Sequence, residues 1–221
     1  MRHITLLAST AGLVLAISAA VGVTSAAAVG SELCTVSKQN PCFHVNMVME
    51  GTTITTKLKG GPLLIKQGLF GDIQCSESTT SMKTTNTGGT TEHVFLGLEG
   101  WTFATCTFGG NECTVVKSVN VGAGMQAVNG EYVAGTGKIT LGRNKAGEEW
   151  GLEAVCPGMK CILKTGKMEL DLINGSPAGI LAEEQFFGSL TGNKTECPTV
   201  APGLNAENEV TSPKSLYGVI R

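Results

Sequence analysis

The sequence predicts an all-β protein, an antiparallel β-sandwich of the immunoglobulin-like or a related type, stapled by disulfides. Three observations predict this class. Thirty of the 221 residues are glycine, apolar residues alternate with a period of two in place of 3.6, and eight cysteines follow an amino-terminal segment typical of export. The runs between turn signals amount to about ten to twelve strands.

The amino terminus has the pattern of an export signal. Met1-Arg2-His3 supplies a single positive charge, an uncharged apolar stretch follows from Leu6 to Val23, and Ala26 and Ala28 fit the small-residue cleavage rule. We therefore expect a signal peptide at residues 1–28, a secreted mature chain and no membrane span after cleavage. An uncleaved anchor is the alternative, because about 20 apolar residues can cross a bilayer.

The mature chain is expected to form one β-sandwich domain, residues 29–221. Residues 29–46 form a candidate amino-terminal extension, pinned by Cys34 and Cys42. Loss of Arg2 leaves 15 Lys and Arg against 18 Asp and Glu, a net charge of −3. This weak balance predicts no nucleic-acid partner.

All eight cysteines lie after the predicted cleavage point, and an even count in an exported chain predicts four disulfides. Sequence-local pairing suggests Cys34 with Cys42, Cys106 with Cys113 and Cys156 with Cys161, which leaves Cys75 with Cys197. Cys75 with Cys106 is the rival pairing, and spacing alone does not decide the connectivity. Zinc is not expected, because the closest cysteines, Cys156 and Cys161, do not have ligand spacing.

Alternation predicts the individual strands. The clearest is residues 167–172, where Met168, Leu170 and Leu172 share one face and charged residues occupy the other. The same pattern places Ile54, Thr56 and Leu58, then Val94, Leu96 and Leu98, then Trp150, Leu152, Ala154 and Cys156, on buried faces. Turns are predicted at Gly60-Gly61-Pro62, Gly88-Gly89, Gly109-Gly110-Asn111, Asn129-Gly130, Asn174-Gly175 and Pro202-Gly203. Only Gly179 to Gln185 retains a helical alternative.

No catalytic constellation is evident, so we expect no enzyme activity, no cofactor and no metal. The G-x-S-x-G motif is absent. The histidines and carboxylates that could activate a nucleophile are limited, in the mature chain, to His44, His93, Asp72, Asp171 and the glutamates. His93 beside Glu92 is a general-base candidate by default. A hydrolase would need two of Glu92, Glu99, Glu149, Glu153 and Glu169 to converge in a cleft.

Few large aromatic residues are available, and the core is expected to take most of them. If the protein binds a small ligand, the candidate contact residues are Trp101, Phe103, Trp150 and Phe186. If the adjacent residues Phe186 and Phe187 lie in a strand, one of the two rings faces away from the sheet interior. An exposed patch there would indicate a binding surface.

From about residue 50 onward the chain resembles a group of small exported actinobacterial proteins, mostly uncharacterised. The resemblance is carried by Gly71-Asp72-Ile73-Gln74-Cys75, Thr84-Thr85-Asn86, an aromatic strand ending in Cys106, Cys113-Thr114-Val115, a two-cysteine turn at Cys156 and Cys161, Cys197-Pro198, and residues 211–217. It implies an exported β-sandwich without an assigned activity. A weaker resemblance, to neocarzinostatin-type apo-chromoprotein carriers, rests on short cysteine loops at residues 106–113 and 156–161 and implies a ligand cleft.

These expectations lead to a secreted, non-catalytic binding or structural module, acting outside the cell or in its envelope on a cell-surface or small-molecule ligand. A small-ligand carrier with an apolar cleft is the alternative. A secreted hydrolase is the third hypothesis.

Overall fold

The computed structural model describes residues 30–66, 71–117, 129–133, 137–143, 147–186, 189–192 and 203–220. The predicted signal peptide lies outside these residues. Within them, every strand pairing is antiparallel. The strands are β1 (Ser31–Cys34), β2 (Thr53–Leu58), β3 (Leu63–Lys66), β4 (Asp72–Thr84), β5 (Phe95–Phe108), β6 (Asn111–Lys117), β7 (Asn129–Val133), β8 (Lys138–Gly142), β9 (Trp150–Cys156), β10 (Met159–Thr165), β11 (Lys167–Ile173), β12 (Gly179–Phe186), β13 (Ser189–Gly192), β14 (Gly203–Ser212) and β15 (Tyr217–Ile220).

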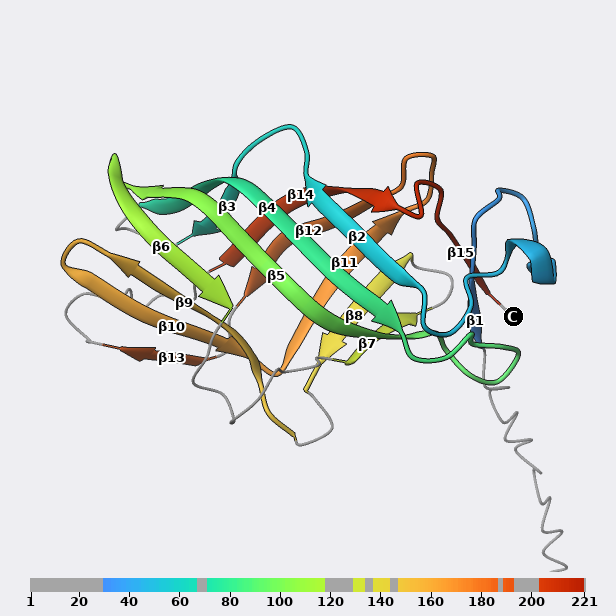
Figure 1. Ribbon diagram of the computed structural model, residues 1–221. Helices are drawn as coiled ribbons and strands as arrows, with labels where there is room; N and C mark the ends of the chain where they lie inside the picture. The colour runs from blue at the N-terminus through green and yellow to red at the C-terminus, as the bar shows by residue number, and fades with distance from the viewer. Residues whose placement is uncertain are drawn as a thin grey trace, which may run out of the picture.

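The main sheet closes on itself. Each strand of the ring pairs with the next in the order β4, β5, β7, β8, β11, β12, β14 and β2, and β2 pairs with β4 again. The short strand β3 also pairs with both β14 and β4, in line with β2. The long strand β5 also pairs through its last residues with β6, from which β9, β10 and β13 branch off. Figure 1 shows the resulting two layers, with β2, β4, β5 and β6 in front of β8, β11, β12 and β14. The predicted antiparallel β-sandwich is confirmed.

The predicted alternation holds along the strands that form the core. In β11, Met168, Leu170 and Leu172 are buried and their neighbours are not. Leu96 and Leu98 of β5 and Ile54 of β2 are likewise buried, and each of these side chains leaves no more than 6% of its surface exposed. The same hydrophobic cluster extends through nearly all strands of the ring and the branch. Alternation therefore identified the buried faces.

Local turn signals were less reliable than alternation. Gly109 and Gly110 do form the β5–β6 turn, and both have positive φ, which glycine adopts without steric cost. The predicted turn at Asn129-Gly130 is wrong, because both residues belong to β7 and pair with β5. The segment Gly179 to Gln185 is a strand, part of β12. The structure has more strands than expected, because four-residue strands such as β1, β3 and β13 are too short to show alternation.

The disulfides differ from the sequence-local expectation at two of the three short pairs. Cys34–Cys42 is confirmed, but Cys106 is bonded to Cys75 and Cys113 to Cys156. The predicted pairs Cys106–Cys113, Cys156–Cys161 and Cys75–Cys197 are therefore wrong, and the rival pairing Cys75–Cys106 is right. Cys161 is also disulfide-bonded, and Cys197 lies outside the described residues.

Strand register explains the observed connectivity. Cys75 lies opposite Cys106 in the β4–β5 ladder, and Cys106 lies opposite Cys113 in the β5–β6 ladder. The β6–β9 ladder pairs Thr114 with Val155, so its register continues to Cys113 and Cys156. Four cysteines thus form one buried row across four adjacent strands. The two bonds join alternate neighbours in that row, β4 to β5 and β6 to β9.

The disulfides indicate an oxidising, extracytoplasmic environment for the folded domain, because such bonds rarely persist in a reducing cytosol. Within the described part of the chain, no helix is long and apolar enough to cross a membrane.

Candidate functional site

The predicted ligand-contact aromatics are gathered in the core. Trp101 stacks on Phe103 with ring centroids 5.5 Å apart and on Trp150 with centroids 5.1 Å apart. Trp101 and Trp150 are 6% and 1% exposed, and Phe103 is partly buried against the same cluster. The Trp101 indole Nε1 donates a hydrogen bond to Ser78 Oγ at 2.8 Å. The side chain of Phe186 and the whole of Phe187 lie outside the described residues.

A small internal cavity lies beside Trp101, inside the closed ring. Its volume is about 10 Å³, which is room for roughly one water molecule. Apolar side chains from β4, β5, β8, β11 and β12 form most of its wall, and Thr56 and Asn208 form a polar corner. The Thr56 Oγ1 and Asn208 Oδ1 atoms are buried without a hydrogen-bond partner among the described residues. A small-ligand carrier needs a pocket of hundreds of Å³.

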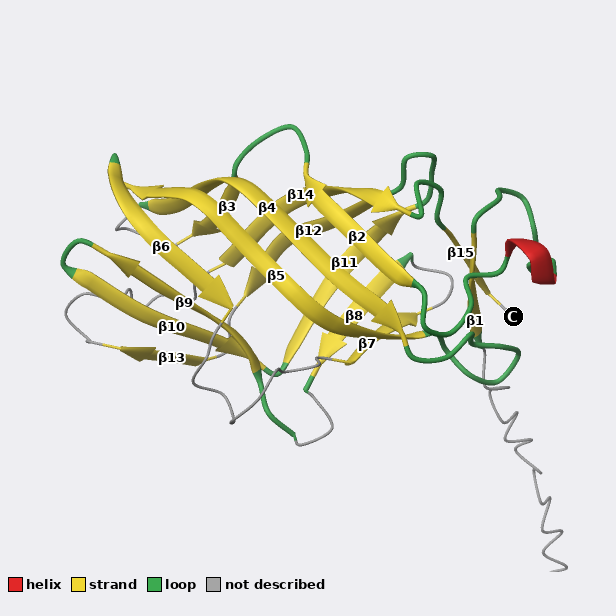
Figure 2. Ribbon diagram, viewed as in Figure 1, coloured by secondary structure: helices red, strands yellow, loops and turns green. Residues whose placement is uncertain are grey.

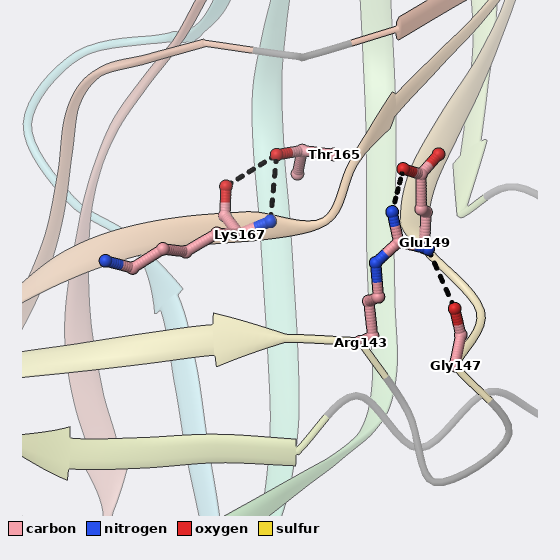
Figure 3. A network of polar contacts seen from close by, with 5 residues as sticks. All are labelled: Arg143, Gly147, Glu149, Thr165 and Lys167. Atoms are coloured by element: carbon pink, nitrogen blue, oxygen red, sulfur yellow. Dashed lines mark hydrogen bonds and ion pairs between the residues drawn. The ribbon is translucent and has the colours of Figure 1, made fainter.

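Three of the five carboxylates considered for hydrolysis form ion pairs with lysine or arginine. Glu149 pairs with Arg143 at 2.7 Å, and Glu153 pairs with Lys160 at 3.0 Å. Figure 3 shows Arg143 reaching both the Glu149 carboxylate and the Gly147 carbonyl, while Thr165 hydrogen-bonds to the backbone of Lys167. Ion pairs and hydrogen bonds of this kind, between residues close in sequence, typically stabilise the turns in which they lie.

Glu169 is paired in the same way. The ammonium group of Lys167 lies 2.6 Å from its Oε1 atom. A hydrogen bond from Lys167 lowers the pKa of Glu169, and the positive charges of Lys167 and Lys138 lower it further. A group with a depressed folded-state pKa contributes stability above its unfolded pKa, and that contribution is lost as pH falls through the folded value.

We expect the pKa of Glu169, titrated by NMR, to rise toward the ordinary glutamate value in Lys167→Met, because both the hydrogen bond and the nearest charge are removed. Lys57→Met, which removes an exposed charge from β2, is the matched control and should leave Glu169 unchanged. An identical Glu169 titration in wild type and Lys167→Met would contradict the ion pair.

The two histidines occupy different surroundings. His44 is exposed in the short 3-10 helix η1 (His44–Asn46). His93 is partly buried just before β5, where its carbonyl accepts a hydrogen bond from Asn86 Nδ2 at 2.9 Å. Among the described residues, no group of three His, Cys, Asp or Glu side chains is arranged to hold a metal ion.

The amino-terminal end of the domain is built differently from the sandwich. Here β1 pairs with the last strand, β15, and residues 35–49, which we call the cap loop, fold back over that pair. Figure 2 shows this end, with η1 in red beside β1 and β15. The Cys34–Cys42 disulfide ties the loop to β1. The buried carboxylate of Glu32 accepts a hydrogen bond from the Cys42 backbone N–H at 3.1 Å.

Further backbone contacts hold the cap loop at both of its ends. Thr35 N–H donates to the Asn46 carbonyl at 2.8 Å, and Val48 N–H donates to the Leu33 carbonyl at 2.8 Å. The disulfide packs with Val219, Met47 and Tyr217 in a second small hydrophobic cluster. The conformation of this loop is therefore set before any partner arrives.

The cap loop nevertheless presents apolar side chains to solvent. Phe43 is 66% exposed and Val45 is 87% exposed, and Val36 and Met49 are also exposed. Only two other large apolar side chains of the described chain, Val155 and Ile173, are exposed to a similar degree. Exposed apolar groups that gather on one short segment are typical of interaction surfaces.

A groove of about 430 Å³ lies beside the cap loop. Three segments far apart in sequence line it: Lys38 to Asn40 of the cap loop, Asn174 from the β11–β12 turn, and Tyr217 to Val219 of β15. The Gly218 backbone N–H donates to Asn174 Oδ1 at 2.9 Å and joins two of these segments. This groove and the exposed cap loop form our candidate functional site.

Sequence reasoning did not identify this site. The sequence predicts only an amino-terminal extension at residues 29–46 and a turn at Asn174-Gly175. The one available signal was the apolar content of Phe43 and Val45 so close to Cys42, where a hairpin turn is normally polar. The groove itself depends on the pairing of β1 with β15, which no local pattern shows.

No family model, curated protein or solved structure matches this chain.

Proposed function

We propose that this protein is an exported, non-catalytic binding module of the cell envelope or extracellular space, and that its binding surface is the cap loop with the adjoining groove. The observation that carries the proposal is the exposure of Phe43 and Val45 on a loop that a disulfide and several hydrogen bonds hold in place. A preformed loop loses little conformational entropy when it binds, so its contacts translate into affinity.

The small-ligand carrier is the weaker candidate. The aromatic residues that would line its cleft include two buried tryptophans, and the cavity next to Trp101 has a volume of only about 10 Å³. The cap loop offers apolar contact area without any rearrangement of the core. We therefore place recognition at the end of the domain and not in its interior.

The proposal predicts that Phe43→Ser with Val45→Ser abolishes cosedimentation of the purified protein with cell envelopes of the source organism. Burying two such side chains contributes about 3 kcal/mol, which corresponds to roughly a hundredfold in affinity. Val155→Ser, which removes an exposed apolar side chain from β9, is the matched control and should sediment like wild type.

Two results would overturn the proposal. One is equal sedimentation of wild type and the Phe43/Val45 variant, which would place binding elsewhere. The other is no sedimentation of wild type at any envelope concentration. A circular dichroism spectrum and denaturation midpoint equal to wild type would show that the variant is folded, as expected for two exposed positions.

A further inference from the structure

We infer that the groove beside the cap loop binds an oxyanion, a carboxylate or phosphate group carried on a hydroxylated small molecule or polymer unit. The inference rests on the proposed binding surface and names the chemistry that this surface recognises. It is argued from the hydrogen-bonding groups of Lys38, Gln39, Asn174 and Tyr217, which line the groove or stand at its edge.

The two amides are oriented so that they present donors. The Gln39 Oε1 atom accepts a hydrogen bond from the Phe43 backbone N–H at 3.1 Å, and Asn174 Oδ1 accepts one from the Gly218 backbone N–H at 2.9 Å. Because each amide oxygen accepts a hydrogen bond from the protein, the NH2 group on the same amide carbon is left to donate in another direction. An NH2 group has two donors and no acceptor.

Lys38 adds a positive charge at the same place. Its side chain is exposed, and the described part of the chain provides it with no acidic partner. Lys59, in contrast, lines a second groove of about 330 Å³ but is neutralised there by Glu207 at 3.3 Å. Lys38 has a backbone φ of 61°, an uncommon value for a residue other than glycine, and the disulfide-tied loop holds it there.

The remaining lining selects against cations. Among the residues that the structure describes, no carboxylate lines this groove; its other side chains are an amide, a phenol and an aliphatic group, from Asn40, Tyr217 and Val219. Tyr217 packs in the second hydrophobic cluster and also lines the groove, where an aromatic side chain suits a sugar or polyol unit. A volume of about 430 Å³ matches one or two such units, because sites for small ligands have volumes of some hundreds of Å³. Donors around one cation are the arrangement that oxyanions require.

The test is a titration of the purified domain with three small probes: glucuronate, glycerol 3-phosphate and glucose. The readout is the set of Gln39 and Asn174 side-chain NH2 signals in a nitrogen-15 NMR spectrum. We expect both anions to shift these signals and neutral glucose to have no effect at the same concentration. The anion that binds with the lower dissociation constant indicates whether the natural ligand carries its oxyanion on a carboxylated sugar or on a phosphate-linked polyol.

Two variants test the residues that carry the inference. Lys38→Asn removes the charge but keeps a residue that tolerates positive φ, and it should weaken anion binding about tenfold or more. Asn174→Asp retains the oxygen that accepts from Gly218 but replaces the donor by a second acceptor, so binding should be lost. Lys57→Asn, on the exposed face of β2, is the matched control and should bind like wild type.

Three outcomes would overturn the inference: glucose binding as well as the anions, no shift of the amide signals by either anion, or full binding by Lys38→Asn. Failure of the proposed function is distinguishable from these. If Lys38→Asn cosediments with envelopes like wild type while the Phe43/Val45 variant does not, the cap loop remains the binding surface and only the oxyanion site is wrong. If neither wild type nor the variants cosediment with envelopes but the anions still bind, the oxyanion site stands and the proposed function is wrong.

Discussion

Replacing Cys113 and Cys156 together by alanine is expected to lower the free energy of unfolding by about 4 kcal/mol, the value of the chain-entropy relation for a loop of this length. The bond joins residues 43 positions apart, so its loss frees a long segment in the unfolded chain. The same relation gives only about 2.5 kcal/mol for the Cys34–Cys42 bond, whose residues are eight positions apart. Urea denaturation of the two double variants under non-reducing conditions measures both losses.

The thiol content of the Cys113/Cys156 variant tests the connectivity independently of stability. Because these two cysteines are partners, their joint removal should expose no new reactive thiol. If the sequence-local pairs were correct instead, Cys106 and Cys161 would each lose a partner, and two thiols would appear. Peptide mapping of the non-reduced wild type should likewise recover Cys75 linked to Cys106.

Trp101→Ala is expected to destabilise the domain by about 3 to 5 kcal/mol, the usual cost of truncating a buried aromatic side chain. Trp101 stacks on both Phe103 and Trp150 and donates its indole N–H to the buried Ser78 hydroxyl. Its loss removes both ring contacts and leaves the Ser78 hydroxyl without that donor. The free energy of unfolding from urea denaturation measures the effect.

Two further variants separate packing from hydrogen bonding at this position. Trp101→Phe retains a ring in the stack but removes the donor, so it should lose only about 1 to 3 kcal/mol. Glu99→Gln, two residues earlier on the exposed face of β5, should stay within about 0.5 kcal/mol of wild type. A loss below about 1 kcal/mol in Trp101→Ala, well under the range for a packed core site, would contradict the observed stack.

Predictions from the sequence agree best with the structure where a residue's surroundings depend only on residues close to it in the chain. Alternation alone predicts that Met168, Leu170 and Leu172 face the core, and they are buried. Proximity in the chain predicts a bond between Cys34 and Cys42, and they are bonded. In both cases the geometry of a single strand or a single short loop decides the outcome.

Agreement is poorest where the outcome depends on which strands become neighbours. Cys106 lies in β5, between two strands that each place a cysteine opposite it. These are Cys75 in β4 and Cys113 in β6. Proximity in the chain favoured Cys113, whereas the folded sheet joins Cys106 to Cys75. Asn129-Gly130 has the composition of a turn, but pairing with β5 and β8 makes it part of a strand. Tertiary context overrode local preference at both places.

The candidate site shows the same division. Patterns among near neighbours are enough to predict an antiparallel β protein, many of its core residues and the short loop that Cys34 and Cys42 close. The pairing of β1 with β15, which brings Lys38 and Gln39 beside Asn174 and Tyr217, is visible only in the folded chain. Alternation and turn chemistry act over a few residues. The groove instead requires contacts between segments more than a hundred residues apart, and only the packing of the whole sheet specifies these.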